Sequence, residues 1–337
     1  MRTASTTVTS CDCVVRAGRT VRLKHTRQTG FSLIELLVAM TIGLVIVSAA
    51  LVAYLGSSEA GRTSAAQSRM NEDAQAALDI LSQQIRMAGN NPKQPGYTLA
   101  TPRNPITNTF SLRGCATTFS NVKPVGATPA ATDINALTCP AGSGPHSIAV
   151  SYEADRYNTI PTSAGVPTDC VGRSLPAQTA SVVQITSPTT TAASNVTFYE
   201  ADNRFYIDTS ATISSPALYC FGNGSGSTPQ PLVENIEDLQ LSFGTAPATG
   251  GNGTVAGYLS AGQIEADNTV VNLPTARERW ARVVTVRICV VARSEQAVAT
   301  DSASAQYLKC DGTLETSPPD RRLRRAYFTT VTLRNRL

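Results

Sequence analysis

The stretch "RQTGFSLIELLVAMTIGLVIVSAALVAYL" (residues 27–55) is a long apolar run with one carboxylate near its start. As a helix, residues 31–55 would span about 37 Å, against roughly 30 Å for the hydrocarbon core of a bilayer. Glu35 is the single charged residue of this run, and basic residues precede the run without interrupting it. This pattern predicts a membrane helix whose N-terminus stays on the cytoplasmic side.

A secretory signal peptide and a plain membrane anchor are the ordinary alternatives. The run is longer than the roughly 7–15 apolar residues of a signal peptide, and no small-x-small cleavage site ends it cleanly. A plain anchor does not explain Glu35, because a carboxylate costs about 2.5–3.5 kcal/mol at the centre of a membrane helix.

The acid therefore needs a partner, and no Lys or Arg follows Glu35 within the next two helical turns. Cleavage after Gly30 would create a positive amine on Phe31, about 6 Å from Glu35 along the helix axis. That amine could neutralise its own Glu35 or the Glu35 of a neighbouring subunit. The second arrangement would pack helices side by side in a fixed axial register.

The segment "TGFSLIELLVAMTIGLVIV" (residues 29–47) resembles the N-terminus of type IV prepilins and type II secretion pseudopilins. The resemblance implies that a prepilin peptidase cuts between Gly30 and Phe31 and methylates the Phe31 amine. It also implies that Glu35, the fifth residue after the cut, mediates subunit docking. The leader is long for this family, and a start further in, such as Val21, would leave the cleavage site intact.

The predicted helix continues beyond the membrane run. Apolar residues recur at helical spacing and form a stripe, with polar residues on the other face: Ala74, Ala77, Leu78, Leu81, Ile85 and Ala88. Gly89-Asn90-Asn91-Pro92 is a stop signal. Residues 31–88 thus read as one helix of about 87 Å, whose second half packs against a globular head.

The rest of the chain predicts strands without intervening helices. Residues 92–146 read as a loop-rich region, and an antiparallel sheet is expected beyond them. In residues 195–209, Asp202-Asn203 is interpreted as a hairpin turn. The remaining predicted strands are 146–154, 231–245, 280–294 and 325–337, the third of which has alternating valine and isoleucine residues.

Three C-terminal segments indicate which of the pilin-like families the chain resembles: "VENIEDLQLSFG", "WARVVTVRICVVARS" and "DRRLRRAYFTTVTLRNRL". In this order, and with "DCVG" (169–172) followed by "LYC" (218–220), they resemble PilW, a minor pilin of type IV pilus assembly. Chains of this family often place an Asp/Gly-rich loop after the first of these strands. Residues 245–257 contain no acid, so no metal site is expected there.

Six of the eight cysteines lie outside the leader, which holds Cys11 and Cys13. The six are widely spaced and form no C-x-x-C pair, which favours disulfides made in an oxidising compartment over metal binding. The sequence alone leaves the connectivity open. Pairing of nearest neighbours is the working hypothesis, and the PilW resemblance supports the middle pair: Cys115–Cys139, Cys170–Cys220 and Cys289–Cys310.

Enzymatic chemistry and nucleic-acid binding have little support in the sequence. His146 is the single histidine outside the leader, and no nucleotide-binding, zinc-protease or hydrolase motif occurs, so no catalytic residue and no cofactor are expected. The whole chain has a net charge of +4, and its first 30 residues alone have a net charge of +5. The remaining residues therefore have a net charge of 4 − 5 = −1, which is close to neutral. The basic run 321–325 beside Tyr327 and Phe328 keeps DNA as an alternative ligand.

The sequence therefore predicts an α+β pilin: a long N-terminal helix on a loop-rich, mainly antiparallel β head. The PilW resemblance implies a structural minor pilin that primes pilus assembly at or near the tip and supports twitching motility. A type II secretion pseudopilin of the GspJ kind and a tip adhesin or DNA-binding pilin are the alternatives. The expected parts are a removed leader (1–30), a membrane or filament-core helix (31–55), its amphipathic continuation (56–91) and the head (92–337).

The expected partners are other minor pilins, the major pilin, the prepilin peptidase and the inner membrane. The precursor would hold its head in the periplasm of a Gram-negative bacterium before joining the surface fibre.

Overall fold

The protein is described here by a computed structural model that covers residues 30–90, 97–98, 110–120, 134–187, 190–209, 214–249, 253–266 and 272–336. The leader, with Cys11 and Cys13, and most of the predicted loop-rich region lie outside the described residues. The chain divides into two units, residues 1–57 and residues 58–337.

Helix α1 runs from Leu33 to Met87, close to the predicted limits. It ends at the predicted stop, where Gly89 has a φ of 74°, a left-handed conformation that glycine adopts without strain. The Gly89 N–H donates to the carbonyl of Ser151 at 2.9 Å, and the Glu153 N–H donates to the carbonyl of Asn90 at 2.9 Å. The end of the helix is thereby joined to a strand of the head.

The predicted apolar stripe of α1 lies in the core of the head unit. Ala74, Ala77, Leu81, Ile85 and Ala88 are fully buried, in one hydrophobic cluster with residues from both main sheets. The spacing of three and four residues puts these side chains on one face of the helix. Alanine at three of the five positions lets the neighbouring elements approach the helix closely.

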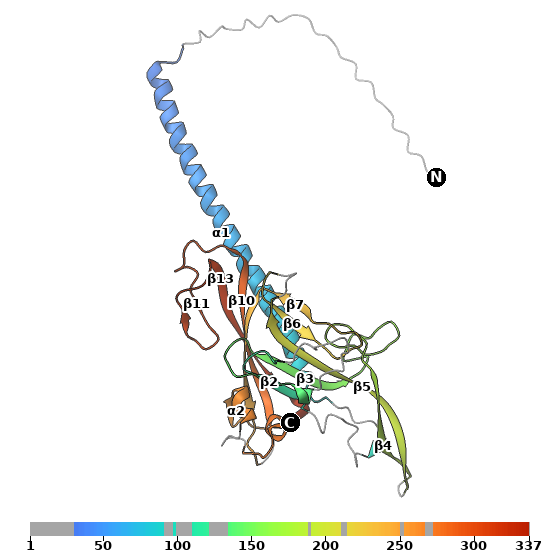
Figure 1. Ribbon diagram of the computed structural model, residues 1–337. Helices are drawn as coiled ribbons and strands as arrows, with labels where there is room; N and C mark the ends of the chain where they lie inside the picture. The colour runs from blue at the N-terminus through green and yellow to red at the C-terminus, as the bar shows by residue number, and fades with distance from the viewer. Residues whose placement is uncertain are drawn as a thin grey trace, which may run out of the picture. The chain divides into compact units, whose positions relative to one another are not determined.

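The larger sheet of the head has seven strands, all paired antiparallel (Figure 1). Its main path follows the order β1-β4-β5-β3-β2, and β6 pairs with β5 and with β7. The strands are β1 (Tyr97–Thr98), β2 (Leu112–Cys115), β3 (Ser147–Ala154), β4 (Ala177–Ser187), β5 (Thr190–Asp208), β6 (Ala217–Phe221) and β7 (Gln230–Glu234).

The second sheet has the order β13-β10-β8-β9 and is also antiparallel. A short hairpin of β11 and β12 lies in the connection between β10 and β13. The elements are β8 (Ile236–Thr245), β9 (Gly257–Leu259), β10 (Val283–Ala297), β11 (Tyr307–Leu308), β12 (Leu314–Glu315), β13 (Arg322–Thr332), the helices α2 (Ala261–Glu265) and α3 (Ala276–Ala281), and short 3₁₀ turns at Ile134–Ala136 and Arg334–Arg336.

The hairpin turn predicted at Asp202-Asn203 is wrong, because both residues lie inside the single strand β5. Their side chains are buried and bonded: Asp202 accepts from Arg204 at 3.0 Å, and the Asn203 amide donates to Gln84 of α1 at 2.9 Å. In β5 this segment pairs with β3 on one side, and from Arg204 onward with β6 on the other. Pairing and buried partners outweigh the local turn preference of an Asp-Asn dipeptide.

The predicted fold class is confirmed: a long helix combined with antiparallel sheets makes an α+β protein. The predicted strand 231–245 is interrupted at Asn235, whose φ of 62° separates β7 from β8 and sends them into different sheets. Residue Trp280, predicted to begin a strand, instead lies in α3, because Thr275 and Glu278 form a capping box ahead of it.

Candidate functional site

The start of α1 is capped by the side chains of Ser32 and Glu35. The Ser32 N–H donates to Glu35 Oε2 at 3.0 Å, and the Ile34 N–H donates to Ser32 Oγ at 3.4 Å. Both bonds satisfy backbone donors that the first turn of a helix leaves open. The carboxylate also lies at the positive end of the helix dipole. Ser32 was missed from sequence, although Ser-x-x-Glu is the signature of this cap.

Residues 31–55 expose their apolar side chains along the whole segment. Phe31 is 88% exposed and Val52 is 72% exposed, and none of the most apolar window of α1 is buried. By length and composition α1 can cross a membrane. Between Glu35 and Glu59 the helix carries no charged residue. Water is a poor solvent for such a surface, so this part of the helix requires lipid or other apolar helices around it.

The head unit contains three disulfides, and they join the same neighbours in sequence that were paired above. They are Cys115–Cys139, Cys170–Cys220 and Cys289–Cys310. Each closes a segment of the chain and can contribute about 2–4 kcal/mol to stability.

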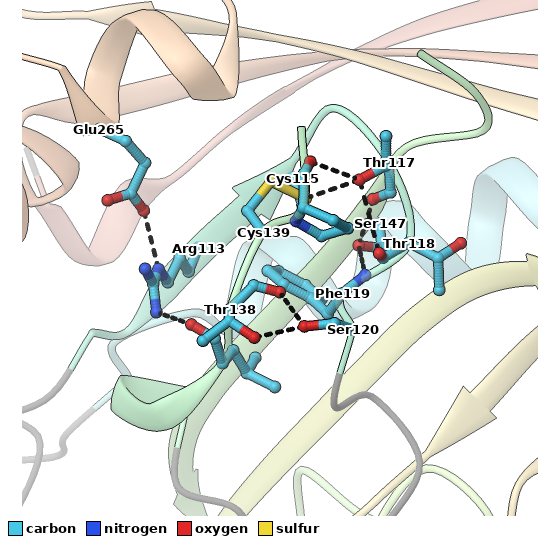
Figure 2. The surroundings of a disulfide bond; sticks show 12 residues. Arg113, Cys115, Thr117, Thr118, Phe119, Ser120, Thr138, Cys139, Ser147 and Glu265 are labelled. Atoms are coloured by element: carbon cyan, nitrogen blue, oxygen red, sulfur yellow. Dashed lines mark hydrogen bonds and ion pairs between the residues drawn. A yellow bond between two sulfur atoms is a disulfide. The ribbon is translucent and has the colours of Figure 1, made fainter. Parts of the chain in front are cut away.

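The first disulfide holds β2 against a segment that leads into β3 (Figure 2). Ser147 lies beside it, and its hydroxyl donates to the carbonyl of Thr117 at 2.8 Å and accepts the Phe119 N–H at 3.1 Å. Two residues before Cys115 on β2, Arg113 donates to Glu265 of α2 at 2.8 Å and to the carbonyl of Leu137 at 2.5 Å. This corner is therefore fixed by a covalent bond, an ion pair and backbone acceptors.

Next to the second disulfide, the carboxylate of Asp169 accepts hydrogen bonds from the backbone of two loops. Asp169 Oδ1 accepts the N–H groups of Val171 (3.0 Å) and Arg173 (2.8 Å), while Oδ2 accepts the N–H of Gly224 (2.9 Å). A side chain at Gly222 would begin 2.4 Å from Asp169 Cβ, so the backbone approaches the acid too closely for any other residue. One carboxylate thus connects the "DCVG" loop to the loop after β6.

The basic run 321–325 takes part in an ion network at the end of the second sheet. The Arg324 side chain is 1% exposed and donates to both oxygens of Glu237, at 2.5 and 3.2 Å, and to Asp320 at 2.7 Å. Burial disfavours the charged form of Arg324, but these hydrogen bonds outweigh it and raise its pKa. Burial would raise the pKa of Asp320, yet its bonds to the arginines lower it.

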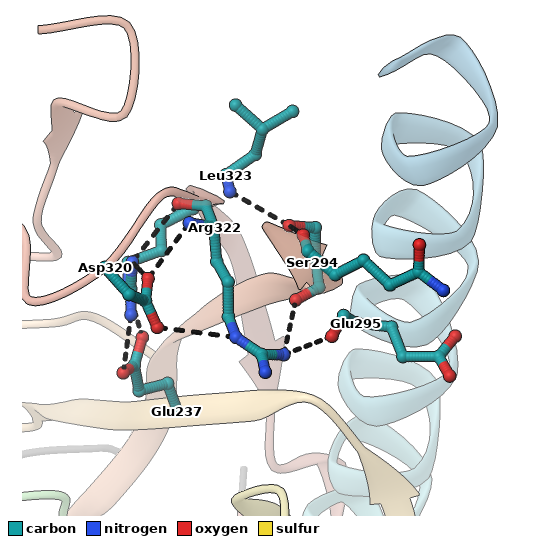
Figure 3. A network of polar contacts seen from close by, with 8 residues as sticks. Glu237, Ser294, Glu295, Asp320, Arg322 and Leu323 are labelled. Atoms are coloured by element: carbon teal, nitrogen blue, oxygen red, sulfur yellow. Dashed lines mark hydrogen bonds and ion pairs between the residues drawn. The ribbon is translucent and has the colours of Figure 1, made fainter. Parts of the chain in front are cut away.

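Figure 3 shows where the network joins three strands: Glu237 comes from β8, Ser294 and Glu295 from β10, and Arg322 from β13. Arg322 donates to the carbonyls of Ser294 and Glu295 and approaches Asp320 at 3.4 Å. Two arginines of the basic run are therefore engaged inside the protein. The three segments that resembled PilW in sequence meet here as adjacent strands.

His146 has a structural role in the head. Its Nδ1 accepts the Leu241 N–H at 2.9 Å, and burial lowers the pKa of its imidazole. Within the described ranges, no group of three or more His, Cys, Asp or Glu side chains could hold a metal ion.

Comparisons with known proteins identify two regions of the chain. Residues 204–335 match the family model of type IV pilus-assembly protein W, PilW, and residues 25–51 match the prokaryotic N-terminal methylation motif. No curated protein and no solved structure matches the chain. The first region contains the strands of the ion network and the second contains the capped start of α1. The chain is thus similar to PilW of type IV pilus assembly over residues 204–335 and carries the N-terminal methylation motif ahead of that region.

Proposed function

We propose that this minor pilin is cut between Gly30 and Phe31, methylated on the Phe31 amine, and incorporated into a complex that primes pilus assembly at or near the tip. The observation that carries the proposal is the exposed apolar segment 31–55, in which Glu35 is the single charged residue and lies inside the matched methylation motif. Gly30 has no atom within 4 Å of the position its Cβ would take, so the proposed cleavage point is accessible.

Glu35 would exchange partners during assembly. In the uncut chain its carboxylate accepts the Ser32 N–H. Cleavage adds a positive amine at Phe31, about 6 Å away along the axis, and a charge-assisted bond to an amine is stronger than one to a neutral N–H. In an apolar environment that difference grows, because the effective dielectric constant is low. Pairing between the amine of one subunit and Glu35 of another would set the axial position of each helix.

The head would work outside the cytoplasm. Its three disulfides suit an oxidising compartment such as the periplasm of a Gram-negative bacterium, and the basic leader keeps the other end of the helix in the cytoplasm. We place the precursor in the inner membrane and the mature chain in the surface fibre. The proposed parts are the leader (1–30), the membrane or filament-core helix (31–55), its continuation (56–91) and the head (92–337).

The partners on this proposal are the prepilin peptidase, other minor pilins and the major pilin, with no cofactor. The role is structural, as expected of a pilin family: binding energy comes from helix packing and from the head selecting its neighbours. DNA binding finds less support, because Arg322 and Arg324 are engaged within the head.

A clean deletion in the native host tests this function. Surface pili and twitching should be lost while type II secretion of an exported enzyme stays normal, and the wild-type chain supplied in trans should restore both. Normal pili with lost secretion would contradict the proposal and assign the chain to a pseudopilin role. Normal pili with normal secretion would contradict the priming role as well.

A further inference from the structure

Strand β13 forms a border of the second sheet, and within the described residues it pairs with β10 alone. The Leu333 N–H, just beyond the strand, donates to the carbonyl of Val284 on β10 at 2.8 Å. In an antiparallel pair such contacts recur at every second residue. The alternate residues of β13 therefore point their N–H and C=O groups to the open side: Ala326, Phe328, Thr330 and Thr332.

No hydrogen bond from elsewhere in the described chain reaches these backbone groups. The first part of β13 is covered, because Arg324 lies over the ring of Tyr307 on β11 at 5.9 Å. The open part, residues 326–333, reads "AYFTTVTL" and carries no charge. Natural proteins usually protect such an edge with charges, prolines or bulges, because an uncharged, β-branched edge pairs readily with another strand.

Phe328 provides an apolar anchor beside this edge. It is 64% exposed, stands opposite Cys289 on β10, and is one of the residues that line a groove of about 660 Å³. The disulfide to Cys310 brings the connection between β10 and β13 over the same groove. An aromatic side chain on the rim of an open strand edge is typical of the residues that dominate binding energy at protein interfaces.

The positive charges at both ends of the open edge of β13 favour a partner strand with negative charges. Arg325 precedes the uncharged stretch and Arg334 follows it, and both are exposed. Two copies of β13 paired antiparallel would bring the arginine-bearing start of one strand close to the arginine-bearing end of the other, and like charges close together across a strand pair are destabilising. A strand with an uncharged centre and acidic residues at its ends would instead be complementary.

We propose that the free edge of β13 receives an extended strand from the head of a different pilin subunit, by strand addition to the second sheet. The partner strand would bond to the backbone of residues 326–332, contact Phe328 with an apolar side chain, and place acids near Arg325 and Arg334. The inference rests on the chain acting among other pilins, as the proposed function requires. It adds a specific surface and the chemistry of its occupant.

Photo-crosslinking in the native host tests the surface with the full-length chain. The probe p-benzoylphenylalanine replaces Phe328, and in a matched control it replaces Tyr157, another exposed aromatic residue of the head at 81%. The expected result is a cross-link from position 328 to an uncharged, acid-flanked segment of another pilin. Cross-links to a second copy of this chain, or a yield at position 328 no higher than at 157, would overturn the proposal.

Thr330→Pro tests the edge itself. The proline removes an N–H that points away from β10, so the sheet keeps its internal bonds while strand addition is blocked. Thr330→Val retains the N–H and is the matched control. With the probe at position 328, the proline variant should lower the cross-link yield about tenfold. An unchanged yield would refute the strand-addition geometry.

Electrophoresis under non-reducing conditions would show whether the proline variant misfolds. If it does, the double variant Arg325→Glu, Arg334→Glu tests the proposed interface instead. Both changes are on exposed side chains, so the fold should persist while cross-linking falls. Piliation distinguishes failure of the proposed function from failure of the proposed β13 interface. If deletion of the chain abolishes pili but the double variant keeps wild-type cross-linking, the function stands and the proposed interface fails.

Discussion

Asp169→Ala should strongly destabilise the head, because one carboxylate serves three backbone donors. Asp169 is 6% exposed and accepts from Val171, Arg173 and Gly224 at 2.8 to 3.0 Å. The Gly224 N–H is buried, and leaving it without an acceptor costs about 1–3 kcal/mol. The other two N–H groups belong to Val171 and Arg173, which are more exposed and can turn to water, so losing each bond costs about 0.5–1.5 kcal/mol.

The expected loss in free energy of unfolding for Asp169→Ala is therefore about 2–6 kcal/mol, a large share of the about 5–15 kcal/mol of a typical domain. Asp169→Asn keeps an acceptor oxygen but places an NH₂ group among backbone donors, and should lose about half as much. The Cys170–Cys220 bond limits how far the loops separate in either variant.

Urea denaturation of the detergent-solubilised chain measures this loss. Trp280 is the single tryptophan, is 1% exposed and packs edge-on against Phe243, so its fluorescence reports unfolding of the head. Asp155→Ala is the matched control, since Asp155 also accepts two backbone N–H groups, in a more exposed turn. A midpoint for Asp169→Ala equal to that of Asp155→Ala would refute the reasoning.

Three further changes test other parts of the structure. Glu35→Val should leave the chain processed but absent from sheared pili, as judged by immunoblot of cell and filament fractions; normal incorporation would rule out the pairing role of Glu35. Gly30→Ser should block cleavage, and a chain that still migrates at mature size would refute the assigned cut. Burial raises the pKa of Asp73 above its unfolded value, so its ionised form destabilises the fold above that pKa. Asp73→Asn should therefore raise the urea midpoint at pH 7, with the gain vanishing once the pH falls below about 4; a gain that persisted in acid would contradict this origin.

The helix was predictable because its signals are local. The apolar run, the stripe from Ala74 to Ala88 and the stop at Gly89 depend on spacing along one element, and α1 follows them. The Ser32 cap was equally local and could have been found from the Ser-x-x-Glu pattern.

The contacts of the head were not predictable, because their partners are distant in sequence. Asp202-Asn203 carries a turn signal, but Gln84 and Arg204 hold both residues inside β5. Asp169 gives no sign that Gly224 is its partner. In the sequence Arg324 is one member of a basic run, and only the pairing of β8, β10 and β13 brings Glu237 to it.

The most direct test of the central claim is mass spectrometry of filaments sheared from the native host. The account predicts a peptide from this chain that begins with N-methylated Phe31 and lacks residues 1–30. A chain that is missing from the sheared filaments, or that is present there with residues 1–30 still attached, would contradict it.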